Sequence, residues 1–143
     1  MGKVDIDISL AKRAENNPSI EELKELIFDV PDSEWANGTG ISLFTYSDDN
    51  VVKSKITLYG SKGFGFLVQY EKLSPQKSCL FLIEGKHNGE TTYIYSGGDA
   101  HLCYKEYLVP KEMVWKALEY FFVTGEMLES LNWTIDYKVP DDF

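Results

Sequence analysis

The chain has 143 residues, of which 43% are hydrophobic and 14% aromatic, so it can build one hydrophobic core and does not have the composition of a disordered protein. Fourteen Lys and Arg against 23 Asp and Glu give a net charge of −9, which opposes binding to nucleic acid or to an anionic membrane and favours basic partners. This length corresponds to one domain, and we expect residues 1–143 to form it, with 1–18 and 139–143 extended or flexible.

The acidic residues gather at the two ends of the chain. Residues 1–35 hold nine acidic and four basic side chains, and residues 112–143 hold seven and two. Charged side chains also interrupt residues 1–17, so this region does not have the pattern of a secretion signal, and apolar runs such as 79–83 are far shorter than the ~20 residues of a membrane-spanning helix. We therefore expect a cytoplasmic protein whose Cys79 and Cys103 stay reduced.

A first helix is predicted after Ser19. Ser19 and Glu22 have the spacing of a capping box, and Ile20, Leu23 and Ile27 form one apolar stripe. Pro31 should end this helix, because a proline disfavours helical backbone at the residue before it.

From about residue 40 to 107 the hydrophobic period changes to two, which predicts an antiparallel meander of five or six strands. Turn residues such as Asn88-Gly89, which suits a tight hairpin, separate the segments. The predicted strands are Ile41–Tyr46, Val51–Leu58, Phe64–Glu71, Ser78–Glu84, Thr91–Ser96 and His101–Tyr107.

A second helix should begin after Pro110 and end at Gly125, which can adopt the left-handed conformation that closes a helix. Its predicted buried side consists of Val114, Ala117, Leu118 and Phe121. The alternating residues 133–138 predict a short final strand, so the fold class is α+β.

The segment Lys62–Leu67 resembles the octapeptide of RNA-recognition motifs, but the resemblance does not extend to function. That octapeptide ends in an aromatic residue where this chain has Gln69, and too few residues separate it from the partner motif expected at Leu43–Tyr46. Alternation instead predicts that Phe64, Phe66, Val68 and Tyr70 share a strand face in the core.

No catalytic, cofactor or metal site is predicted. His101 and Cys103 would share one strand face, but zinc needs three or four protein ligands. Neither histidine has a nucleophile in a suitable context, no phosphate-binding glycine loop is present, and the paired carboxylates fall at helix starts, turns and the tail.

The end of the chain resembles a known family. A proline-entered helix with an Ala-Leu pair and a Phe, then Thr-Gly-Glu and a Trp, is similar to the ending of the immunity-protein family numbered first among those of bacterial polymorphic toxin and contact-dependent inhibition systems. The matching residues are Leu108-Val109-Pro110, Ala117-Leu118, Phe121-Phe122, Thr124-Gly125-Glu126 and Asn132-Trp133, preceded by Gly97-Gly98-Asp99.

The resemblance implies a non-enzymatic inhibitor that blocks the active site of a cognate toxin domain, of deaminase or nuclease type. The acidity agrees, because enzymes acting on nucleic acid have basic clefts that an acidic binder approaches rapidly. Two alternatives stay open: a small metabolite-binding or enzymatic α+β domain with an aromatic-lined pocket, and an adaptor module. We expect a monomer or weak dimer that uses no cofactor and binds neither nucleic acid nor membranes.

Acidic residues next to exposed aromatic ones are typical of the energetic centre of a protein interface. On this ground the sequence predicts a partner-binding surface made of Asp48, Asp49, Glu90, Tyr93, Tyr95 and Asp99. Phe121 and Trp133, in contrast, are expected to be structural residues that anchor the second helix to the sheet.

Overall fold

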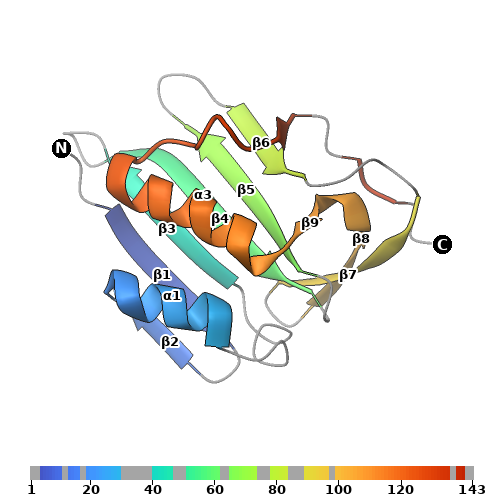
Figure 1. Ribbon diagram of the computed structural model, residues 1–143, viewed down its shortest axis with the longest axis horizontal. Helices are drawn as coiled ribbons and strands as arrows, with labels where there is room; N and C mark the ends of the chain where they lie inside the picture. The colour runs from blue at the N-terminus through green and yellow to red at the C-terminus, as the bar shows by residue number, and fades with distance from the viewer. Residues whose placement is uncertain are drawn as a thin grey trace.

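The computed structural model describes residues 4–10, 13–16, 19–29, 40–46, 51–61, 65–73, 78–83, 89–96, 99–135 and 138–140. Within them, an antiparallel sheet carries two helices side by side on one face, which confirms the α+β class (Figure 1). The helices are α1 (Ile20–Asp29) and α3 (Lys111–Thr124). Neither is long and apolar enough to cross a membrane.

The main sheet is antiparallel throughout its described strands. In spatial order it contains β10 (Trp133–Thr134), β6 (Ser78–Leu82), β5 (Phe66–Lys72), β4 (Val52–Gly60), β3 (Gly40–Tyr46), β1 (Val4–Leu10) and β2 (Arg13–Asn16). The short β9 (Leu108–Val109) also pairs with β5, directly after the 3₁₀ turn η1 (Lys105–Tyr107). A separate two-stranded sheet consists of β7 (Thr91–Ser96) and β8 (Asp99–Tyr104), which we call the ribbon.

The N-terminal segment forms two strands that are not among those predicted from the sequence. Strands β1 and β2 pair with each other, and β1 pairs with β3 so that Ile8 lies opposite Ile41. The signal is present in the sequence, because residues 4–10 alternate apolar and polar side chains with the period of a strand.

The predicted antiparallel sheet is confirmed, and β3, β4, β5 and β6 follow one another in it as a meander, but the strands after β6 pair in a different order. β6 pairs with β5 and β10, and β7 pairs with β8, so Asn88-Gly89 does not join paired strands. β10 lies beside β6 where β7 would have continued the sheet, with Trp133 opposite Leu82. The final strand is also shorter than predicted, since it ends at Thr134 and Ile135 is 75% exposed.

The two helices follow their sequence signals closely. The Glu22 amide donates to Ser19 Oγ (3.1 Å) and the Ser19 amide donates to Glu22 Oε1 (3.3 Å), which completes the predicted capping box. The buried residues of the helices are Leu23, Leu26 and Ile27 of α1 and Val114, Ala117, Leu118 and Phe121 of α3, all of which pack in one core cluster.

Strand β5 has a hydrophobic core on each face. Phe66, Val68 and Tyr70 pack with the helices, whereas Leu67 belongs to a second cluster with Ile94 and other ribbon residues. Because strand side chains alternate between faces, the ribbon packs on the face of β5 opposite to the helices. Phe64 lies outside the described residues.

The C-terminal end of α3 is fastened to the sheet by hydroxyl groups. Gly125 has φ +74° and its amide donates to the Phe121 carbonyl (2.7 Å), as the sequence predicted. Its carbonyl accepts a hydrogen bond from Ser54 Oγ of β4 (2.8 Å), and Ser54 is hydrogen-bonded in turn to Thr45 of β3. A Cβ on Gly125 would lie 2.9 Å from Thr45 Cγ2, so this position favours glycine for two reasons.

We expect Gly125→Ala to be more destabilising than Gly89→Ala, measured by denaturant unfolding. Both residues have positive φ, and left-handed backbone costs an alanine about 1–2 kcal/mol. A Cβ at Gly125 would also collide with the Thr45 side chain, whereas nothing lies within 4 Å of a Cβ at Gly89. Thr45→Ser removes the opposing methyl group and should recover the excess cost; equal costs for the two glycine variants would contradict the contact.

Phe121→Ala should lower the free energy of unfolding by about 3–5 kcal/mol, as large-to-small core substitutions do. Phe121 is 0% exposed, and its ring meets the Tyr70 ring edge-on at 6.1 Å between centroids. Chemical denaturation measures the loss. A variant of normal stability that loses only partner binding would show that Phe121 is a contact residue instead.

Candidate partner-binding surface

The ribbon presents one of the two predicted tyrosines to solvent. Tyr93 is 51% exposed and Tyr95 is half-buried, and they lie opposite Leu102 and Ala100 of β8. Ile94 is buried in the second core cluster, so the tyrosines occupy the outward side of the ribbon. Asp48 and Asp49 lie outside the described residues.

The two predicted acids of the ribbon do not join the tyrosines. Asp99 is opposite Ser96 at the tip, in the row of Ile94, and the Glu90 carbonyl accepts from the Lys105 amide (2.9 Å) at the base. Six residues of strand separate Glu90 from Ser96, about 20 Å. The acids are therefore spread over the ribbon and do not surround the tyrosines.

His101 and Cys103 are also separated by their environments. Cys103 is fully buried in the second core cluster, whereas His101 is exposed nearer the tip. The two thiols of the chain form no disulfide. Among the described residues, no group of three or more His, Cys, Asp or Glu side chains is placed to hold a metal ion.

The two helices, together with the six residues that follow α3, carry a larger share of the charge. Residues 19–29 and 111–130 contain eight carboxylates and three lysines, a net of −5. All eight acidic residues are exposed, and we call this surface the acidic helical face. The sequence shows acid at both ends of the chain, and the fold places α1 and α3 next to each other, so much of it meets on one side of the molecule (Figure 1).

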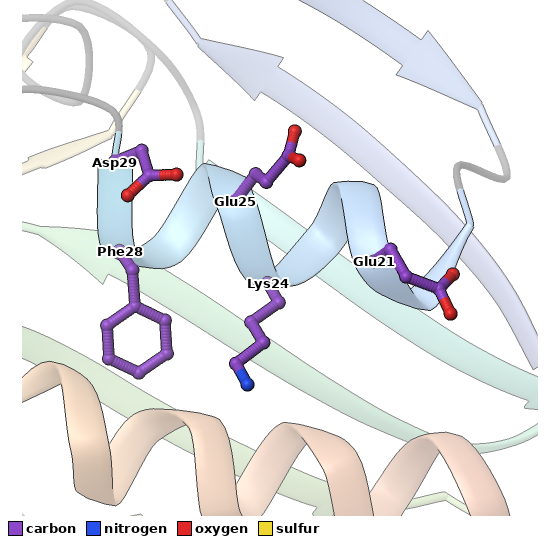
Figure 2. A pocket seen from close by; sticks show the side chains of 5 residues that line it. All are labelled: Glu21, Lys24, Glu25, Phe28 and Asp29. Atoms are coloured by element: carbon purple, nitrogen blue, oxygen red, sulfur yellow. The ribbon is translucent and has the colours of Figure 1, made fainter.

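A cavity of about 340 Å³ lies along α1 and is lined by Glu21, Lys24, Glu25, Phe28 and Asp29. Lys24 and Phe28 extend toward α3, whereas the Glu25 carboxylate lies on the other side of the helix (Figure 2). Glu21, Glu25 and Asp29 follow one another at helical spacing, so they form one stripe. We call this site the α1 cavity.

The lysines nearest the α1 cavity are engaged with α3 or with the backbone. Lys24 Nζ lies 5.8 Å from the centre of the Trp115 ring, a cation–π contact. Lys111 Nζ of α3 donates to the Phe28 carbonyl (3.1 Å) at the end of α1, where the helix dipole favours a cation. Among the described residues, Lys55 and Glu71 of the sheet form an ion pair, and this pair does not involve the acidic residues of the stripe.

Helix capping explains only part of the α1 acids. Glu22 completes the capping box, and Glu21 lies in the first turn, where a negative charge is favourable. Glu25 lies beyond that turn, and Asp29 lies in the last turn, where the dipole disfavours a carboxylate. Capping therefore does not account for two members of the stripe.

One acid beside α3 has a structural role. Tyr70 donates its hydroxyl to Glu126 Oε2 (3.3 Å), and burial, together with the charge and hydrogen bond of Glu126, raises the pKa of Tyr70 from 10.0 to about 12. Trp133, whose Nε1 donates to the Leu128 carbonyl (2.9 Å), packs edge-on against the same tyrosine. This agrees with the anchoring role expected for Trp133.

The raised pKa of Tyr70 predicts a dependence of stability on pH. The folded state holds this proton more tightly than the unfolded state, so the stabilisation is complete below pH 10 and is lost as the pH rises toward 12. Tyr70→Phe should cost about 1 kcal/mol at pH 7 through the lost hydrogen bond, and this cost should shrink above pH 10. Urea unfolding of both proteins from pH 7 to 11 measures it; parallel curves would contradict the raised pKa.

The arrangement suits recognition of a cationic protein surface. Exposed carboxylates on two adjacent helices produce a negative field that attracts basic partners and speeds association. The aromatic residues of β5 on the helix side, Phe66 and Tyr70, are buried in the core beneath α3, so the aromatic-lined sheet pocket of the metabolite-binding alternative gains no support from them.

No family model matches the chain, and no curated protein matches it.

Proposed function

We propose that this chain is a non-enzymatic immunity protein that binds a basic toxin domain, of deaminase or nuclease type, and blocks its active site in the cytoplasm. The observation that carries the proposal is the acidic helical face, which holds eight carboxylates and three lysines in α1, α3 and the six residues that follow α3. The resemblance of the segment from Leu108 to Trp133 to an immunity-protein family supplies the class of partner.

The placement of Asp29 supports a binding role for this face. A carboxylate in the last turn of a helix is unfavourable by about 0.3–1 kcal/mol, so helix stability does not account for its presence. A basic partner would offset this cost on binding. The ribbon, which holds Tyr93, Tyr95 and Asp99 of the surface predicted from the sequence, carries fewer charges and spreads them along its length.

The adjacent upstream reading frame is where a cognate toxin domain is sought, and association kinetics with that purified domain test both the function and the surface. Glu25→Lys with Asp29→Lys should slow association about tenfold or more at low salt and flatten its salt dependence, without lowering the melting temperature, because a lysine is favourable in the last turn of α1. Glu90→Lys with Asp99→Lys on the ribbon is the matched control, because it changes the net charge equally. It should slow association much less.

The outcomes separate the function from the surface. A larger effect of the ribbon variant would assign the contact to the ribbon, as the sequence predicted, and would reject the helical face. Absence of any complex between the wild-type protein and the purified toxin domain, with no protection of cells that express the toxin, would reject the immunity function.

A further inference from the structure

The outer side of α3 contains an apolar hollow that the core does not explain. It has a volume of about 420 Å³ and is lined by Lys116, Glu119, Tyr120, Val123, Thr124 and Leu128. Tyr120 is 38% exposed and Val123 is 66% exposed. We call this site the α3 hollow.

Packing and helix propensity do not require these two residues. The buried stripe of α3 is already complete with Val114, Ala117, Leu118 and Phe121. A β-branched residue such as Val123 loses side-chain freedom in a helix, so at an exposed helical position it costs stability relative to alanine. An apolar centre with a polar rim is the usual composition of a protein interface, and tyrosine is enriched among its strongest contacts.

The surrounding charge indicates what occupies the hollow. Lys116 and Glu119 both line the hollow, and the surface around it is acidic overall, with a net charge of −5 over residues 19–29 and 111–130. A second copy of this chain would bring a second net charge of −9 to a face that is itself acidic. A segment that is apolar on one side and basic on the other complements both the hollow and its surroundings.

We propose that the α3 hollow receives an amphipathic basic segment of the protein partner, with an apolar side chain on Tyr120 and Val123 and a cation beside Glu119. This inference rests on the proposed function and names the chemistry of the partner's contact segment. The two surfaces then have different roles in binding. The carboxylates of α1 speed association with the basic partner, and the apolar contact in the α3 hollow slows its dissociation.

Val123→Glu tests the apolar contact against simple charge attraction. The probe is a synthetic amphipathic helix of leucine and lysine, about 14 residues long, and the control is a scrambled peptide of the same composition. Charge attraction alone predicts that the added carboxylate tightens binding, whereas an apolar contact predicts a loss of affinity of roughly fivefold or more. Calorimetry measures the dissociation constants, and thermal melting checks that the variant folds.

Two exposed tyrosines provide a matched comparison. Tyr120→Ala should weaken binding of the amphipathic peptide by roughly fivefold, whereas Tyr93→Ala on the ribbon should leave it unchanged, although Tyr93 is the more exposed of the two. In an NMR spectrum of the isotope-labelled protein, addition of the peptide should shift the backbone amide signals of Val123 and Thr124. Equal binding of the scrambled peptide, or equal effects of the two tyrosine variants, would overturn the proposal.

Three further results test this inference, and the last two keep it apart from the immunity function. If sedimentation shows a dimer that Val123→Glu abolishes, the hollow is a self-interface and the proposal is wrong. If the toxin domain binds and Tyr120→Ala with Val123→Glu leaves its affinity unchanged, the inference fails while the immunity function stands. If the toxin domain does not bind but the peptide selects the α3 hollow, the function fails and the hollow keeps its assignment.

Discussion

The burial of β5 on both of its faces is the constraint on which the rest of the structure depends. Phe66, Val68 and Tyr70 pack in the same core cluster as the buried residues of α3. Leu67 belongs to the second cluster, which contains the buried residues of the ribbon. A shift of β5 by one residue would exchange these sets and disrupt both cores together. The positions of α3 and the ribbon, and hence of the two candidate surfaces, follow from the register of this single strand.

Local signals predicted much of the fold because they depend on neighbouring residues. The capping box at Ser19, the buried stripe of α3 and the left-handed Gly125 involve groups within a few positions of each other. Strand pairing is different, because it depends on distant segments. The sequence did not indicate that Trp133 and Thr134 would lie beside β6. Residues 4–10 alternate with the period of a strand, but the alternation does not say that β3 is the partner of this strand.

The candidate surface was predictable only in part, for the same reason. Uneven charge along the chain was visible in the sequence, but only the contact between α1 and α3 joins its two acidic ends into one face. The ribbon tyrosines were found by strand alternation, while Tyr120 and Val123 were missed. On a helical wheel Tyr120 lies at the margin of the buried stripe of α3 and Val123 lies opposite it, so helical periodicity alone assigns neither residue to a binding surface.

The hydrogen bond from Lys111 to the Phe28 carbonyl joins residues 83 positions apart, and this separation affects synthesis in the cell. At about 5–20 residues per second, a ribosome takes roughly 4–17 seconds to make the intervening chain, so α1 emerges long before α3 can cover its apolar side. During that interval Leu23, Leu26 and Ile27 have no α3 to pack against. The nascent chain is therefore expected to need a chaperone, or shielding by the ribosome, until residue 124 has emerged.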